Sequence, residues 1–241
     1  MHDEPYSADF ADVYDLIYAD GRKDYAAETE ALVQLIRDRH PSAASLLDVA
    51  CGTGEHLAHL QHEFKHVEGV EYAAPMRAKA AAKLPGVAIH PGDMRDFDLG
   101  RTFDVVTCLF SSIGYTSSTD ELQSAIRAMA AHVAEDGLLI VDPWFYVGDW
   151  EGGHLEHHIA TGDGRTLLRL AHSRRDGRKS SIDYHYLVGD QNGGIRYFVD
   201  THDTTLYTKD EYQEAFRAAG FTHIEFVQGW SATRGRIVGR R

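Results

Sequence analysis

The sequence has few cysteines, no long apolar run and little positive charge. Two cysteines in 241 residues, Cys51 and Cys108, do not make a disulfide framework and suit a reducing cytoplasm. No stretch approaches the roughly 18 apolar residues of a membrane-spanning helix, and the acidic N-terminal residues lack the apolar core of a signal peptide. The formal net charge of −13 disfavours a nucleic-acid-binding surface, which needs a basic face. We therefore expect a cytoplasmic protein that neither crosses a membrane nor binds nucleic acid.

The chain does contain a short apolar run that ends in a glycine-rich turn. Residues 45–49 have the composition of a buried parallel strand, and a helical spacing of leucines begins after Glu55. Gly52 and Gly54 have no Cβ, so the turn can be sharp and a ligand can approach the backbone closely. Open α/β sheets bind nucleotides at such turns, at the carboxyl end of a strand. The stretch therefore predicts a nucleotide-type cofactor site.

Acidic residues around this turn indicate which cofactor it binds. A dinucleotide fingerprint requires a third glycine where this chain has Leu57. Asp48 instead precedes the turn, and Glu71 ends the next predicted strand, 67–71. S-adenosylmethionine (SAM) has no phosphate to repel carboxylates, and its ribose offers two hydroxyl groups that a carboxylate can accept from. The pattern favours SAM, with Glu71 on the ribose rather than simply exposed at a strand end.

Further cofactor contacts are predicted in other loops. Asp93, after the third predicted strand, can accept a hydrogen bond from the adenine amino group or form only a turn. Met76 and Met94 would lie near the adenine, although Met76 fits the core equally well. Tyr14 and Tyr18 are one helical turn apart, in either an arm packed on the domain or a lid that places Tyr14 on SAM. The predicted cofactor-binding residues are Tyr14, Asp48, Ala50, Gly52, Gly54, Glu71, Met76, Asp93, Met94 and Phe110.

The acceptor is expected beside the fourth predicted strand, 103–110. In a doubly wound sheet this strand adjoins the first, so its loop, which ends at Tyr115, faces the methyl group of SAM. Tyr115 is the leading candidate for a polar group near the acceptor. After the fifth strand, Asp142 and Trp144 are suited to the wall of a substrate pocket.

A change in the spacing of apolar residues after the fifth strand predicts a second sheet. Residues 166–173, 181–188 and 195–207 alternate like antiparallel strands, with turn signals between them. The fold class is therefore α/β: a doubly wound, Rossmann-like sheet with a small antiparallel β insertion after strand five. The pattern D-x-x-C-G-x-G from Asp48 to Gly54, followed by Glu71, resembles the cofactor loop of class I SAM methyltransferases, so the larger sheet is expected to be of that type. The predicted parts are an N-terminal lid and helix (1–40), a SAM-binding core (41–147 and 206–241) and an insertion that lines the substrate cleft (148–205).

Other features are predicted to be structural. A helix is expected over 119–135, and residues 230–234 are expected to connect the last two strands of the main sheet. His56, His59 and His62 recur every three residues, so they drift around a helix and are interpreted as a solvated face rather than as metal ligands. The charge of Lys23 is interpreted as part of a solvated helix start. No metal is expected, and no G-x-S-x-G or H-E-x-x-H motif indicates a hydrolase.

Several of these segments together resemble a known family. They are Lys23-Asp24-Tyr25, the cofactor loop 46–54, Gly92-Asp93-Met94-Arg95-Asp96-Phe97, Phe110-Ser111-Ser112-Ile113-Gly114-Tyr115 and Pro143-Trp144. They are similar to the N,N-dimethyltransferases that finish dTDP-linked amino sugars for macrolide antibiotics. The likeness covers nearly the whole chain.

The resemblance implies SAM as cofactor and a nucleotide sugar, methylated on its amine, as the small-molecule partner. The family has an arginine near its C-terminus that suits the substrate pyrophosphate, and Arg234 matches it. Arg175 lies in a matching segment of the predicted insertion. Arginine fits this task because its donor fork matches phosphate oxygens. The implied substrate-binding residues are Tyr115, Trp144, Arg175 and Arg234.

The predicted chemistry is an in-line displacement at a sulfonium methyl group. The protein must hold a neutral amine near the methyl carbon. With an unperturbed pKa of about 10, Tyr115 is predicted to position the amine rather than to take its proton. Three alternatives stay open: a methyltransferase for another small acceptor, a nicotinamide-dependent oxidoreductase, and a non-catalytic SAM-binding module. A homodimer would be ordinary for such a protein.

Overall fold

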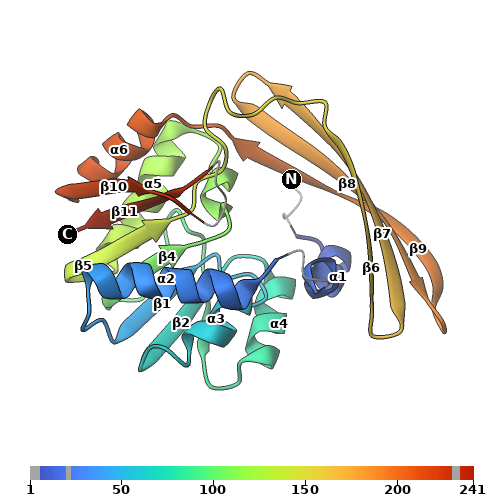
Figure 1. Ribbon diagram of the computed structural model, residues 1–241, viewed down its shortest axis with the longest axis horizontal. Helices are drawn as coiled ribbons and strands as arrows, with labels where there is room; N and C mark the ends of the chain where they lie inside the picture. The colour runs from blue at the N-terminus through green and yellow to red at the C-terminus, as the bar shows by residue number, and fades with distance from the viewer. Residues whose placement is uncertain (1–5, 20–22, 230–233) are drawn as a thin grey trace.

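The computed structural model describes residues 6–19, 23–229 and 234–241, which form two β-sheets with their helices (Figure 1). In chain order the elements are α1 (Ala8–Tyr18), α2 (Tyr25–Arg39), β1 (Ser45–Val49), α3 (Glu55–Leu60), β2 (His66–Glu71), α4 (Ala74–Lys83), β3 (Ala88–Pro91), β4 (Phe103–Cys108), the 3-10 helix η1 (Ser112–Tyr115), α5 (Thr119–Ala131), β5 (Val133–Val141), β6 (Leu155–Gly162), β7 (Arg165–Asp176), β8 (Lys179–Asp190), β9 (Gly194–Thr205), α6 (Lys209–Ala218), β10 (His223–Val227) and β11 (Arg236–Arg240).

The larger sheet has seven strands in the order β10-β11-β5-β4-β1-β2-β3. It is parallel except for β11, which runs antiparallel to both of its neighbours. Apolar side chains of α2 and α3 form a core on one face of the sheet, and those of α5 and α6 form a core on the other. Burial on both faces explains the continuous apolar runs of the central strands. The predicted doubly wound α/β fold is confirmed.

The helix predicted over 119–135 ends early, at Ala131. Val133 is buried and begins β5, where it pairs with Phe103 of β4. Asp136 has a positive φ of 61°, which lies outside the range of a right-handed α-helix, so the helix cannot extend through this residue. The prediction was wrong over the last turn because burial of a β-branched residue in the sheet outweighs the local helical pattern.

The smaller sheet follows β5 and is antiparallel, in the order β6-β7-β8-β9. The strands β7 and β8 contain the first two alternating segments seen in the sequence, and β9 covers the third up to Thr205, two residues short of its predicted end at 207. No strand was predicted at β6, an edge strand whose side chains are mostly exposed, so its sequence shows little alternation. Of the predicted connection between β10 and β11, residues 230–233 lie outside the described residues.

Helix α1 lies between the two sheets (Figure 1). Phe10, Val13 and Ile17 pack on the smaller sheet, in a cluster that includes Leu167 and Tyr186. On another face of the helix, Ala11 packs against Ala73 and Met76 beside β2 and α4. Both layers therefore hold α1 in place. No helix within the described ranges is long and apolar enough to span a membrane.

Candidate functional site

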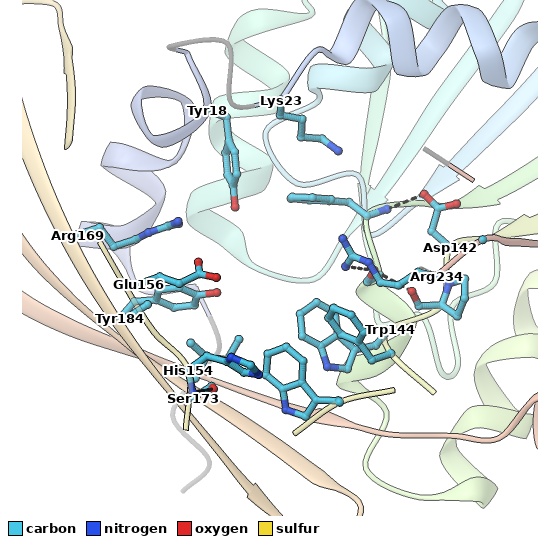
Figure 2. A pocket seen from close by; sticks show the side chains of 18 of the residues that line it. Tyr18, Lys23, Asp142, Trp144, His154, Glu156, Arg169, Ser173, Tyr184 and Arg234 are labelled. Atoms are coloured by element: carbon cyan, nitrogen blue, oxygen red, sulfur yellow. Dashed lines mark hydrogen bonds between the residues drawn. The ribbon is translucent and has the colours of Figure 1, made fainter. Parts of the chain in front are cut away.

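Two cavities open near the carboxyl ends of β1 and β4, and the Phe110 side chain lines both. The larger has a volume of about 960 Å³ and is lined by residues that follow β1, β2, β3 and β4. The smaller has a volume of about 400 Å³ and lies between the β4 and β5 loops and the inner face of the smaller sheet (Figure 2). We refer to them as the larger and the smaller cavity.

The turn after β1 shapes the larger cavity. Gly52 lines it with a φ of +58°. Gly54 does not line it: a Cβ at this position would lie only 2.9 Å from Leu84 Cδ1. Gly54 therefore allows the turn to pack against the end of α4, whereas Gly52 leaves the backbone open to a ligand.

Two carboxyl groups line the larger cavity without an ion-pair partner in the described chain. Glu71 Oε2 accepts a hydrogen bond from the Gly52 N–H at 2.8 Å, and its Oε1 accepts one from the Ala73 N–H at 2.7 Å. Burial raises the pKa of Glu71 above its ordinary value. Asp48 Oδ1 accepts a hydrogen bond from Thr107 Oγ1 at 2.7 Å, and burial raises the pKa of Asp48 to about 7. A cationic ligand would favour ionisation of both groups.

All of the predicted cofactor residues except Gly54 line this cavity. Asp93 forms an ion pair with Arg95 at 2.5 Å, so the arginine is already neutralised. The cavity thus offers carboxylates and apolar side chains and no unpaired basic group within the described chain. A diphosphate-bearing dinucleotide would meet Glu71 and Asp48, whereas a sulfonium with ribose hydroxyls suits them. The residues fit SAM.

Phe110 stands where the two cavities meet. Its φ is +54° and that of Ser111 is +66°, a left-handed conformation that costs of order 1 kcal/mol or more per residue. Two hydrogen bonds to the residues that follow β5 stabilise this strained backbone. Asp142 Oδ2 accepts one from the Phe110 N–H at 3.2 Å, and Ser111 Oγ donates one to the Pro143 carbonyl at 2.9 Å. The Lys23 Nζ lies 3.7 Å from the centre of the Phe110 ring.

Lys23 and His56 are not solvated, contrary to the prediction. Lys23 Nζ lies 2.6 Å from Glu28 Oε2, and the side chains of both residues are less than 10% exposed. His56 Nε2 lies 3.1 Å from the same oxygen. Burial lowers the pKa of Lys23 and of His56. The error arose because Glu28 lies on α2, and no local pattern shows that it is buried against these residues.

Tyr115 lies on the cofactor side of the site. It lines the larger cavity and not the smaller one. Its hydroxyl oxygen accepts a hydrogen bond from the Tyr6 hydroxyl at 2.8 Å and is also bonded to His202 Nδ1. Burial raises the pKa of Tyr115 above its ordinary value, so the phenolate is even less populated at neutral pH.

The structure separates the two arginines that were expected to act together. Arg234 lines the smaller cavity, donates to Ser111 Oγ at 3.1 Å and lies over the ring of Trp144, 5.3 Å from its centre. Arg175 lies outside both cavities and donates to the carbonyl oxygens of Trp150 and Gly177. The site role expected for Arg175 is therefore corrected: it lies beyond the part of β7 that faces the cavity, next to the turn.

Arg169 was not recognised from the sequence. It lies on the inner face of β7, is 6% exposed, and lines the smaller cavity with Ala171 and Ser173. An arginine among inward-facing Leu167 and Ala171 is the signal that would have identified it. The opposite wall carries Trp144 and Arg234 (Figure 2). Among the described residues, no group of three or more histidine, cysteine or acidic side chains could hold a metal ion.

Comparisons with known proteins agree with this geometry. Residues 46–137 match the methyltransferase domain family. The chain is 43% identical to the dTDP-3-amino-3,4,6-trideoxy-alpha-D-glucopyranose N,N-dimethyltransferase of Streptomyces venezuelae, over 97% of this chain and 98% of that protein. The chain belongs to the dTDP-amino sugar N,N-dimethyltransferase family. Another member, the dTDP-4-amino-2,3,4,6-tetradeoxy-D-glucose N,N-dimethyltransferase of Saccharopolyspora spinosa, is 42% identical over 98% of this chain and 94% of its own length.

Solved structures of sugar N-methyltransferases share the fold of this family member. The DesVI protein of Streptomyces venezuelae superimposes with a TM-score of 0.91 at 43% identity, over 97% of this chain and 99% of that one. An amino pentose methyltransferase of calicheamicin biosynthesis from Micromonospora echinaspora, solved with SAM bound, has a TM-score of 0.86 at 40% identity over the whole of both chains. SAM is the cofactor of this N-methyltransferase.

Proposed function

We propose that this protein transfers methyl groups from SAM to the amino group of a dTDP-linked amino sugar in antibiotic biosynthesis. The observation that carries the proposal is the smaller cavity, which meets the cofactor cavity at Phe110 and contains Arg234, half-buried over the ring of Trp144 and without an ion-pair partner in the described chain. Burial lowers the pKa of Arg234, so an anion that restores its charge balance is favoured. The pyrophosphate of a nucleotide sugar is such an anion.

The proposed cofactor contacts follow the wall of the larger cavity. Glu71 accepts from the ribose hydroxyls, and Asp93 with Met94 and Met76 surrounds the adenine. Gly52 and Ala50 leave the backbone accessible, Asp48 supplies negative charge beneath the turn, and Tyr14 covers the cofactor from α1. When bound, SAM supplies the methyl group on its sulfonium. In this arrangement residues 41–147 and 206–241 hold the cofactor, residues 148–205 line the acceptor cleft and residues 1–40 close it.

The protein's task at the acceptor is orientation. Arg234 and Trp144 hold the nucleotide end, and Phe110 with Tyr18 leaves the amine facing the cofactor cavity. The amine must be neutral when it attacks, and its proton leaves to water. Tyr115 contributes by position, because its hydroxyl oxygen already accepts from Tyr6 and its pKa is raised by burial. Proximity of this kind supplies several orders of magnitude in rate.

The decisive experiment is mass spectrometry after incubation with SAM and a panel of acceptors. The panel contains dTDP-amino sugars, the corresponding free amino sugars, and hydroxyl analogues of the dTDP-sugars. One or two methyl additions on the dTDP-amino sugars alone are expected, and the mass also reports the number of rounds. Methylation of the free amino sugars or of a hydroxyl group at equal rate would contradict the assignment to a nucleotide-linked amine.

We further propose that the protein is a cytoplasmic homodimer paired through the outer face of the smaller sheet. That face exposes apolar side chains, including Ile159, Leu187, Ile195 and Tyr197. Its charged groups pair within the face, as Arg174–Asp183 and Lys179–Asp203. A second copy could therefore cover these two pairs without leaving any of their four charges without its partner. Light scattering is expected to give the mass of two chains, and a monomer mass across the micromolar range would contradict the proposal.

A further inference from the structure

Arg169 is a buried charge without a charged partner. Its side chain projects from the inner face of β7, and the residue is 6% exposed. The guanidinium carbon lies 5.0 Å from the centre of the Tyr184 ring. In the part of the chain that the structure describes, no carboxylate forms an ion pair with it. A ring face compensates a buried cation only in part.

Other buried cations in the same region are neutralised by carboxylates. Lys23 has Glu28 at 2.6 Å, and Arg236, whose side chain is 4% exposed, has Asp142 at 2.9 Å. Burying an ion without a partner is strongly unfavourable. Arg169 therefore differs from its neighbours in a way that a ligand anion would explain.

The second unpaired cation of this cavity is Arg234, and it lies opposite. Figure 2 shows Arg169 on the side formed by the smaller sheet and Arg234 on the side formed by the loops of the larger sheet, with both side chains directed into the cavity. Glu156 of β6 lines the same cavity, so it holds one acidic group beside the two arginines. Two guanidinium groups on facing walls suit a ligand with two anionic groups, one for each set of donors.

We propose that Arg169 and Arg234 bind the diphosphate of the acceptor nucleotide from opposite walls of the smaller cavity. This inference rests on the proposed function and assigns to Arg169 the part that the sequence suggested for Arg175. A diphosphate offers one phosphate group to each guanidinium, whereas a monophosphate has a single phosphate group for two arginines on opposite walls, so the pair should discriminate by the number of phosphates.

Calorimetric titration of the protein saturated with S-adenosylhomocysteine (SAH) tests this without turnover. The probes are thymidine, dTMP and dTDP, and the variants are Arg169→Gln and, as a matched control from the same strand outside the cavity, Arg175→Gln. Charge-assisted hydrogen bonds are strong enough that we expect Arg169→Gln to weaken dTDP binding by roughly 10–100-fold. We expect dTMP to be affected less and thymidine within about twofold, with Arg175→Gln matching wild type.

Unchanged SAH affinity shows that the Arg169→Gln variant is folded, and Arg169→Lys should restore part of the dTDP affinity. Wild-type dTDP binding by Arg169→Gln would overturn the inference. The clearest contradiction would be wild-type dTDP affinity together with a shifted pH profile of kcat in Arg169→Gln. That result would mean that the charge of Arg169 acts on the acceptor amine rather than on the diphosphate. If wild-type protein bound no dTDP yet methylated free amino sugars, the proposed function itself would fail, which is a distinct result.

Discussion

The two cavities carry opposite unpaired charge. The larger contains Asp48 and Glu71, which form no ion pair in the described chain, whereas the smaller contains Arg169 and Arg234, which also form none. SAM is a cation at its sulfonium, and a nucleotide sugar is an anion at its diphosphate. Under the proposed function, the protein leaves each cavity with unpaired charge of one sign, and the ligand of that cavity carries the opposite charge.

This difference also explains how the ligands avoid each other's site. A diphosphate in the larger cavity would lie against Asp48 and Glu71, and a sulfonium in the smaller cavity would lie beside two arginines. Like charges in a site of low dielectric cost several kcal/mol. Phe110 lines both cavities and therefore stands between the two environments.

The strongest test of this contrast is the Lys23–Glu28 ion pair, which lines the smaller cavity beside Phe110. In Glu28→Ala, Lys23 would remain buried without a partner beneath the Phe110 ring. Removing one partner of a buried pair costs about 3–5 kcal/mol of unfolding free energy, to be measured by urea denaturation. Asp203→Ala, which breaks the exposed pair with Lys179, should cost less than about 1 kcal/mol. Equal losses of unfolding free energy in the two variants would mean that the buried pair contributes no more to stability than the exposed pair.

The charge of the larger cavity is tested by pH. The pKa of Asp48 is about 7 in the folded protein, above its ordinary value of 3.8, so the folded state binds this proton more tightly than the unfolded state. The ligand-free protein should therefore lose stability as pH rises from about 4 to about 7, by up to about 4 kcal/mol from this group. Asp48→Asn lacks this dependence and should be the more stable form at pH 8.

Denaturant midpoints of wild type and Asp48→Asn across this range measure the effect. Saturating SAM is expected to reduce the wild-type dependence, because a nearby cation favours the carboxylate. Parallel curves for the two proteins would show that Asp48 titrates normally.

The smallest effect is expected at Tyr115. Tyr115→Phe removes the hydrogen bonds with Tyr6 and His202, but the side chain does not line the smaller cavity. A net hydrogen bond contributes about 1 kcal/mol, so kcat should fall by less than about tenfold. A fall of several orders of magnitude with SAH affinity intact would show that the hydroxyl takes the amine proton.

The cofactor side was predictable from sequence because its residues are local. Asp48, Gly52 and Glu71 come at or just after the ends of consecutive parallel strands, and such strand ends meet at one edge of the sheet. The positions of these residues along the sequence therefore predict that they lie together at one edge of the sheet. The fold class was predictable for the same reason.

The acceptor side was less predictable because it is assembled from distant segments. Arg169 and Arg234 come from different sheets, and Lys23 precedes α2. Which arginine of β7 faces the cavity depends on which part of the strand forms the cavity wall. The resemblance indicated Arg175, and Arg169 was not recognised. The edge strand β6 and the early end of α5 were missed because pairing and burial in the sheets, rather than local periodicity, determine them.

Helix α1 packs on both layers at once, through Phe10 and Ile17 on one side and Ala11 on the other. Tyr14 lies on the wall of one cavity and Tyr18 on the wall of the other. A movement of α1 that lets spent cofactor leave would thus also loosen the grip on the acceptor. We expect a sugar that receives two methyl groups to be exposed to release between the first and the second round of transfer.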